Sequence, residues 1–550
     1  MKNLRLCWAA FGLCVSLGVS AQRGSCGTGV SWALADGTLT ISGEGNMTDF
    51  TDPRYGSSNL PSWDIYKDNI VKVVIEGGVK HVGSYAFYDY SNLQAVTFAE
   101  GVKSIGSSAF YGCEGIKELL FPSSMKIISG QHNTNEDAEP QVSTFGMGGT
   151  GTAYMSSEAF RGCAGLTSVT IPRGGIGVGS GTFKNCRNLK SVYWDVADYP
   201  SYGFSTANEN GFRDYGTQGS SPFSGCRLKE VVFGSEVDSI PGGLLYGQSE
   251  LSAIKFSGKT EYVGKDAFKE TVWFDNLPNG LVYIDKAAYA FKGLMSTPTA
   301  ISITEGTKSI TEGLFANQTY LTKVTVPSTL TYMGYEVFEG CRSLGEVEWN
   351  AEDCKFGQTY GAPFSATALY TITFGEKVRK IPDGLCSGCR YITEVKMPAS
   401  VVEVGESAFS DCSGLEAVGF SENMTSIEAR AFLDCAKLSE LILPNSLREI
   451  GENAFSGCTG LETLSIPESV DSIGRSAFYN TGLEILVFNA RNCMLVYESY
   501  STAFPSSVRE LEFGDAVECI PKYMCSKMTN LVKLKVGRNV REMPSNCFSN

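Results

Sequence analysis

The chain has 550 residues, of which 43% are hydrophobic and 19% charged, and its formal net charge is −14. This length permits a large buried core, whereas the acidity makes nucleic acids and anionic membrane surfaces unfavourable partners, because both present phosphates. Only two histidines occur, His81 and His132, so neither a catalytic triad nor a histidine metal site is expected. No enzyme, metal or cofactor is predicted.

Residues 1–21 predict a secretion signal. Lys2 and Arg5 form a basic start, and the apolar stretch Leu6–Val19 is shorter than the ~20 residues of a transmembrane helix. Small residues in Val19–Ala21 predict cleavage after Ala21. No later apolar run is long enough to span a membrane, so we expect a secreted or outer-surface protein.

Residues 22–69 are predicted to form a β-rich cap, and residues 70–550 a solenoid of about 19 coils. The repeating unit of 23 residues is most regular between Ala408 and Phe478, where Ala-Phe pairs begin at residues 408, 431, 454 and 477. A fixed period of this length is typical of stacked repeats, each of which buries its apolar face against its neighbours. The fold class is therefore a leucine-rich-repeat solenoid, mostly β, with short helical or 3₁₀ turns.

Each position of the unit has a physical role. Leu441 and Leu443 alternate with Ile442, as expected for a strand with one buried face. Gly451 is expected to allow a sharp turn with positive φ. Phe455 is expected to be the bulky apolar wedge of its coil.

A longer period of about 140 residues overlies the short one. Trp349–Cys354 returns as Phe488–Cys493, and Ile-Pro pairs begin at residues 240, 381 and 520. Each block is predicted to hold regular coils and one irregular coil, in which a loop follows Trp194, Trp349 or Phe488.

These repeats resemble the BspA-like leucine-rich-repeat family of bacterial surface proteins. One copy of the motif reads Ile450-Gly451, Ala454-Phe455, Cys458, Leu461, Leu464 and Ile466-Pro467. The N-terminal residues Cys26-Gly27, Trp32 and Asp36–Gly43 resemble the cap that often opens such proteins. The resemblance implies export and adhesion to proteins, cells or matrix, and it brings no catalytic residue. The partner follows from it only by analogy.

Cysteines recur in one slot of the unit, at Cys389, Cys412, Cys435 and Cys458. Parallel side chains are poorly aimed for disulfides, so a row of buried free thiols is favoured. The pair Cys386 and Cys389 imitates a redox motif, but a local disulfide or inert thiols fit it better. Two cysteines outside this slot, Cys519 and Cys525, could pair with each other.

Insertions near 130–154 and 198–221 are the main candidates for binding, since long loops on rigid scaffolds often carry function. The alternatives are a mobile polar loop for the first and aromatics that fold back over a widened coil for the second. Aromatic side chains recur in the second loop and in its counterparts one and two blocks later, and could stack on sugars or anchor a protein. These candidate ligand-binding residues are Tyr199, Tyr202, Phe204, Phe212, Tyr215, Phe356, Tyr360, Tyr497 and Tyr500.

The outward strand positions are mostly small or charged, which favours broad protein contact over an enzyme cleft. Examples are Thr167, Ser168, Thr170, Thr393, Glu394, Lys396, Glu462, Thr463 and Ser465. The sequence thus predicts an exported protein that binds host or other-cell surface proteins, with carbohydrate binding as the alternative. Because Phe548-Ser549-Asn550 stops one residue before the expected cysteine, we expect the sequence to be truncated at its C-terminus or to end in a frayed coil.

Overall fold

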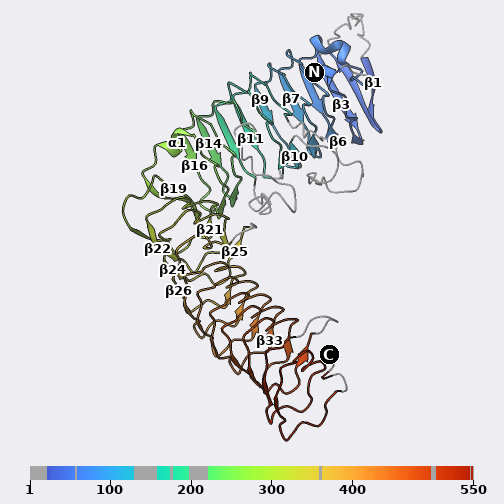
Figure 1. The fold of residues 1–550 in the computed structure, drawn as a ribbon. Coiled ribbons are helices and arrows are strands. Elements are labelled where there is room, and N and C mark those ends of the chain that lie inside the picture. The colour runs from blue at the N-terminus through green and yellow to red at the C-terminus, as the bar shows by residue number, and fades with distance from the viewer. Residues whose placement is uncertain are drawn as a thin grey trace, which may run out of the picture. The chain divides into compact units, whose positions relative to one another are not determined.

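The computed structural model describes residues 22–55, 59–128, 158–173, 177–196, 221–357, 362–496, 503–544 and 547–548. These residues form about 17 solenoid turns with almost no helix, which confirms the predicted fold class. They form two compact units. Of the described residues, unit 1 contains those up to 194 and residues 222–229, and unit 2 contains residues 195, 196 and 221 and those from 230 onward. Figure 1 shows strands stacked as successive rungs within each unit.

Unit 1 opens with the expected β-rich segment. Its first sheet contains β1 (Gln22–Gly27), β2 (Val30–Ala35), β3 (Thr38–Gly43), β5 (Lys72–Ile75) and β7 (Ala95–Phe98). The first three strands are antiparallel, and β3, β5 and β7 are parallel. Trp63, between the short 3₁₀ helices η1 (Pro53–Tyr55) and η2 (Asp64–Asn69), is fully buried and packs edge-on against Trp32 and Phe50.

The coils of unit 1 add two further parallel ladders. The short-strand ladder consists mostly of two-residue strands and contains β4 (Gly45–Asn46), β6 (Val79–Val82), β8 (Ser104–Ile105), β10 (Ile127–Ile128) and β12 (Gly177–Val178). The longer-strand ladder, with strands of three or four residues, contains β9 (Glu118–Leu120), β11 (Ser168–Ile171) and β13 (Ser191–Trp194).

Unit 2 repeats the alternation of longer and short strands. The longer strands are β14 (Glu230–Phe233), β16 (Ala253–Lys255), β20 (Thr299–Ser302), β22 (Leu321–Val326), β24 (Glu346–Trp349), β26 (Thr371–Phe374), β28 (Glu394–Lys396), β30 (Ala417–Gly419), β34 (Thr463–Ile466), β36 (Ile485–Phe488), β38 (Glu510–Phe513) and β39 (Lys533–Lys535), together with the shorter β32 (Glu440–Leu441). The short strands are β15 (Ser239–Ile240), β17 (Tyr262–Val263), β21 (Ser309–Ile310), β23 (Tyr332–Met333), β25 (Lys355–Phe356), β27 (Lys380–Ile381), β29 (Glu403–Val404), β31 (Ser426–Ile427), β33 (Glu449–Ile450), β35 (Ser472–Ile473) and β37 (Met494–Leu495).

The predicted wedge phenylalanines form continuous stacks inside the coils. Phe409, Phe432, Phe455 and Phe478 are fully buried, and neighbouring rings lie nearly parallel with centroids 5.3 Å apart. The segments that carry these rings are hydrogen-bonded turns rather than the helical turns that the sequence allowed. One aromatic layer per coil therefore fills the core, which explains why the 23-residue spacing is so regular.

The prediction that Gly451 adopts a positive φ was wrong. The residue with positive φ in this turn is Asn453, at 54°. A Cβ at position 451 would lie 2.4 Å from the backbone nitrogen of Ala429 in the preceding coil. Glycine is therefore required because two coils approach closely, and the left-handed conformation falls two residues later.

A hairpin interrupts the repeat in unit 2. Helix α1 (Val272–Asp275), whose first turn is capped by the Thr271 side chain, leads into the antiparallel strands β18 (Gly280–Ile284) and β19 (Ala287–Lys292). The 23-residue step reaches Phe291, but this residue lies on β19 and is only partly buried. The buried ring that packs against Phe268 is Tyr289, with centroids 5.5 Å apart.

The row of cysteines consists of buried free thiols, as favoured from the sequence. The Cys435 thiol donates to the carbonyl of Phe409, and the Cys458 thiol to that of Phe432, each at 3.2 Å. The thiol thus gives a partner to the carbonyl of the wedge residue one coil earlier. At Cys341, which occupies the same slot, burial raises the pKa of the thiol to about 11.

Candidate functional site

The longer strands present a solvated face. Every outward side chain named from the sequence is exposed, and the residues between them, such as Val395 and Leu464, are buried. Ion pairs link neighbouring coils across this face, for example Lys533 with Glu510 at 2.9 Å. Because these pairs are exposed, they add little stability and leave their charges accessible to a partner.

Two large apolar side chains that the sequence analysis did not identify are exposed on the longer strands of unit 1. Leu120 and Tyr193 are 72% and 40% exposed, and each pairs in register with Thr170 on β11. The exposed leucine and tyrosine thus lie on either side of Thr170, and tyrosine is a side chain that often carries binding energy at protein interfaces. The signal was present as a break in the otherwise small or charged outward positions.

The short-strand ladder of unit 2 is interrupted at an irregular coil. One sheet ends with β25, and the next begins with β27. In regular coils the residue after the short strand donates to the preceding coil, as Gly405 does to the carbonyl of Ile381 at 2.9 Å. Pro382 occupies the position of Gly405 in its own coil and has no N–H to donate. Among the described residues, another ladder ends at β37, and Ile520-Pro521 follows in the next coil.

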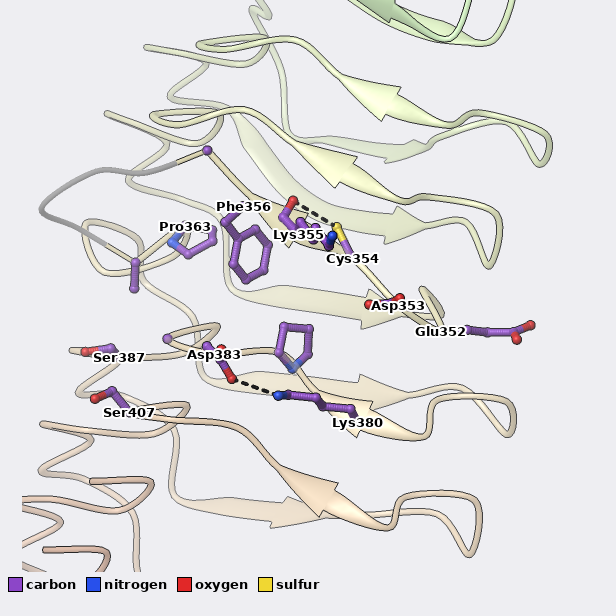
Figure 2. A pocket seen from close by; sticks show the side chains of 14 residues that line it. Glu352, Asp353, Cys354, Lys355, Phe356, Pro363, Lys380, Asp383, Ser387 and Ser407 are labelled. Carbon is purple, nitrogen blue, oxygen red and sulfur yellow. Dashed lines mark hydrogen bonds and ion pairs between the residues drawn. The ribbon is translucent and has the colours of Figure 1, made fainter. Parts of the chain in front are cut away.

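A pocket of about 710 Å³ occupies this interruption (Figure 2). Its walls include Phe356 from β25, Pro363, Lys380 from β27 and Asp383, with Glu352 at the rim. The Phe356 ring is partly buried and packs edge-on against Trp349, with centroids 5.9 Å apart. The pocket therefore combines one aromatic ring with carboxylates, hydroxyls and the amines of Lys355 and Lys380.

Lys380, one of the pocket's lysines, is paired with two carboxylates. The Lys380 Nζ lies 3.2 Å from an oxygen of Asp383 and 2.7 Å from one of Glu403. Burial alone would lower the pKa of Lys380, but the hydrogen bond to Glu403 and the charge of Asp383 raise it above its usual range. Lys380 is therefore a fixed cation beside acceptors, an arrangement suited to hydrogen-bonding a neutral, hydroxyl-rich ligand.

Of the candidate aromatics, Phe356 is the one that the structure describes, and it lines the pocket. The others lie outside the described residues: Tyr199, Tyr202, Phe204, Phe212, Tyr215, Tyr360, Tyr497 and Tyr500. The insertions near 130–154 and 198–221 fall almost entirely outside them as well.

A chain of polar side chains in unit 1 includes His81. Its Nδ1 lies 2.8 Å from Ser104 Oγ and its Nε2 3.3 Å from Asp49, which also accepts from the backbone N–H of Ser84. Burial raises the pKa of Asp49, but the hydrogen bond and charge of His81, together with the bond from Ser84, lower it well below its usual range. The Ser104 and His81 side chains are buried inside the coil, so this chain connects the N-terminal segment to the first coils and offers no accessible nucleophile.

Other sites of chemistry are sparse among the described residues. No group of three or more metal-binding side chains occurs within them. Cys386 and Cys389 are both buried, with their free thiols inside the core. The structure also differs from the proposed pairing of Cys519 with Cys525, because Cys519 is exposed beside Glu542 and Cys525 is buried against Cys547.

The stacked coils and their repeating motif define a leucine-rich-repeat solenoid. The sequence matches the BspA type leucine-rich repeat region over residues 58–136, 149–213, 214–289, 285–416, 379–501 and 425–550. These matches cover most of the chain, which therefore belongs to this family. No curated protein matches the chain.

Several solved structures are similar to it. A leucine-rich repeat protein from Eubacterium ventriosum is 19% identical, covering 80% of this chain and 95% of its own, with a TM-score of 0.26. One from Bacteroides ovatus is 16% identical, covering 92% and 98%, with a TM-score of 0.25. A leucine-rich cell surface protein from Faecalibacterium prausnitzii is 16% identical, covering 94% of each chain, with a TM-score of 0.21.

Within the described parts of the chain, no helix combines the length and the apolar character needed to cross a membrane.

Proposed function

We propose that this chain is an exported cell-surface or extracellular protein that binds proteins of a host or of another cell, through its longer-strand face and its inserted loops. The observation that carries the proposal is the ordered face itself: outward side chains from successive strands stand in register on a tightly packed core. Such a surface makes many contacts at fixed spacing with little ordering cost, which favours protein binding. Membership of the BspA type family supports the same role.

Export rests on the basic and apolar pattern of residues 1–21, which lie outside the described residues. Expression of the whole chain in a bacterial host followed by N-terminal sequencing of the secreted protein tests this part of the proposal. The expected mature N-terminus is Gln22. A chain that stays in the cytoplasm with Met1 intact would contradict it.

The binding role is tested with residues 22–550 immobilised against a panel of purified matrix and cell-surface proteins. Reversing charge on the strand face at Glu394 and Lys396, or deleting residues 130–154 or 198–221, is expected to weaken any interaction found with the parent chain. The matched control is Arg430→Glu, in a turn away from the longer strands, where Arg430 pairs with Glu406 at 3.0 Å. Unchanged binding by all the face and loop variants would contradict the proposal.

Carbohydrate binding is the second candidate, and the pocket beside Phe356 favours it. An aromatic ring next to fixed carboxylates and hydroxyls is a common way to hold a sugar, because the ring stacks on C–H groups while the polar atoms bond the hydroxyls. A glycan array should then show binding that Phe356→Ala reduces, as should Tyr202→Ala and Tyr215→Ala in the second insertion. An array without signal would exclude this alternative.

A further inference from the structure

Two cysteines of unit 2 occupy facing positions in neighbouring coils. The backbone N–H of Cys525 donates to the carbonyl of Cys547 at 3.0 Å, as that of Phe455 does to Ala477 at 2.8 Å. Cys525 therefore occupies the position that Phe455 has in its own coil, the wedge position. Cys547 occupies the position that Ala477 has in the next coil. A small residue in the wedge slot leaves space that the second thiol enters.

The two sulfur atoms contact each other directly. They lie 3.7 Å apart, and the side chains are 4% and 0% exposed. Cysteines of the regular row behave differently, since the thiols of Cys435 and Cys458 are directed to backbone carbonyls. Neighbouring thiols of the row also interact with each other, as Cys435 does with Cys458. At 525 and 547 the thiol of Cys547 donates to the sulfur of Cys525.

The backbone spacing suits a covalent bond. Paired strands lie about 4.8 Å apart, inside the range of about 4.4–6.8 Å over which Cα atoms of a disulfide are separated. Strands β38 and β39 of the same two coils are paired in register, which holds the coils at this spacing. The sulfurs, which lie 3.7 Å apart, then have to approach to the S–S bond length of about 2.05 Å.

We propose that Cys525 and Cys547 form a disulfide that joins the two coils when the chain folds in the presence of a disulfide oxidant. One thiolate attacks the oxidant's disulfide, forming a mixed disulfide and releasing one oxidant thiolate. The second cysteine then attacks the protein sulfur of that mixed disulfide and releases the other oxidant thiolate. Two electrons and two protons pass from the cysteines to the oxidant, which ends as two thiols.

The contact between the two sulfurs also favours the first step, attack of a thiolate on the oxidant's disulfide, near neutral pH. The contact with Cys525 lowers the pKa of Cys547 to about 7, whereas the same contact and burial raise that of Cys525. A thiol whose pKa is close to the ambient pH attacks disulfides most effectively.

The crosslink would join the coil that carries β39 to the coil that carries β38. Formation of the bond in the cell rests on the proposed export, because disulfides persist in oxidising compartments. The bond itself depends only on the geometry, so it can be tested without export.

The test uses the full chain, refolded with a mixture of reduced and oxidised glutathione, denatured, alkylated and digested with trypsin. Cys519, Cys525 and Cys547 then fall in the separate peptides 510–522, 523–527 and 542–550. The expected product joins 523–527 to 542–550, is lighter by two hydrogen atoms than the two reduced peptides, and disappears after reduction. Alkylation of both cysteines, or a crosslink between 510–522 and 523–527, would overturn the proposal.

Two variants and one dynamic measurement sharpen the result. Cys519→Ser should keep the crosslink, whereas Cys547→Ser should abolish it. Reduction of the wild-type protein should accelerate hydrogen exchange in residues 519–544 and leave the regular coils at 426–473 unchanged. Equal exchange in both redox states would show that the bond does not hold these coils.

Discussion

The regular coils around residues 403–473 and the irregular coil around Phe356 are built from the same kind of unit but differ in one backbone donor. In the regular coils the short strands β27 to β37 form an unbroken ladder, and the wedge rings stack at constant spacing. At the irregular coil, Pro382 removes an N–H, the ladder stops, and a pocket opens beside Phe356. The interruption of the ladder thus separates a structural region from a candidate binding region.

The largest expected difference between the two regions is in the cost of removing an aromatic ring. Phe432→Ala should lower the free energy of unfolding by about 3–5 kcal/mol, because Phe432 is fully buried between two stacked rings. Phe356→Ala should cost only about 1 kcal/mol, because its ring is partly exposed in the pocket. Urea denaturation of the two variants measures both values, and equal losses would remove the distinction between the regions.

Glycine replacements give the next largest contrast. Gly451→Ala should destabilise by about 3 kcal/mol, because the new Cβ would meet the backbone of the preceding coil. Gly384, at the pocket, has φ of +65° and no neighbouring atom within 4 Å of a Cβ. Gly384→Ala should therefore cost only about 1 kcal/mol of backbone strain. Thermal melts of both variants test this order, and a larger loss at position 384 would contradict it.

A smaller effect, dependent on pH, is expected where the N-terminal segment meets the first regular coils. The pKa of Asp49 is lowered in the folded state, so its contribution is present above the unfolded pKa of about 3.9 and is lost as pH falls through the folded value. Asp49 is half exposed, so the contribution is no more than about 1 kcal/mol. Asp49→Asn should lower stability by this amount at pH 7 and reduce the difference between pH 7 and pH 3; an unchanged pH profile would show that the contact is not stabilising.

The smallest change in stability is expected for Lys380→Met, which should nevertheless weaken sugar binding. Lys380→Met keeps the length of the side chain but removes the cation held by Asp383 and Glu403. Stability should change by less than about 1 kcal/mol because the group is partly solvated. Binding of any sugar found on the array should weaken at least several-fold, whereas Lys533→Met, on the longer-strand face, should leave it unchanged. Equal effects of the two variants would place the sugar outside the pocket.

Periodicity was sufficient to predict the solenoid, the wedge stack and the buried thiols, because each depends on a side chain repeated at the same place in every coil. Gly451 was identified correctly but for the wrong reason, since close approach of two coils cannot be inferred from one unit. The hairpin at β18 and β19 was missed because Phe291 preserves the 23-residue step although its backbone does not follow the coil.

For the candidate site, the sequence indicated the irregular coil and Phe356 but not the pocket or its lysine. Lys380 belongs to a short strand and resembles any other exposed charge until the ladder is seen to stop in front of it. The Ile-Pro pairs were visible as a long-period repeat, and the missing proline N–H is the physical signal that could have located the interruption. The contact between Cys525 and Cys547 was hidden because the two residues occupy different slots of the unit.

The most direct test of the binding role is a set of dissociation constants for one partner identified with the parent chain. Residues 22–550 would be compared with the two loop deletions, with the charge reversal at Glu394 and Lys396, and with the control Arg430→Glu. We predict at least tenfold weaker binding for the face or loop variants and no change for the control. The same dissociation constant for every chain would contradict binding through the strand face and loops.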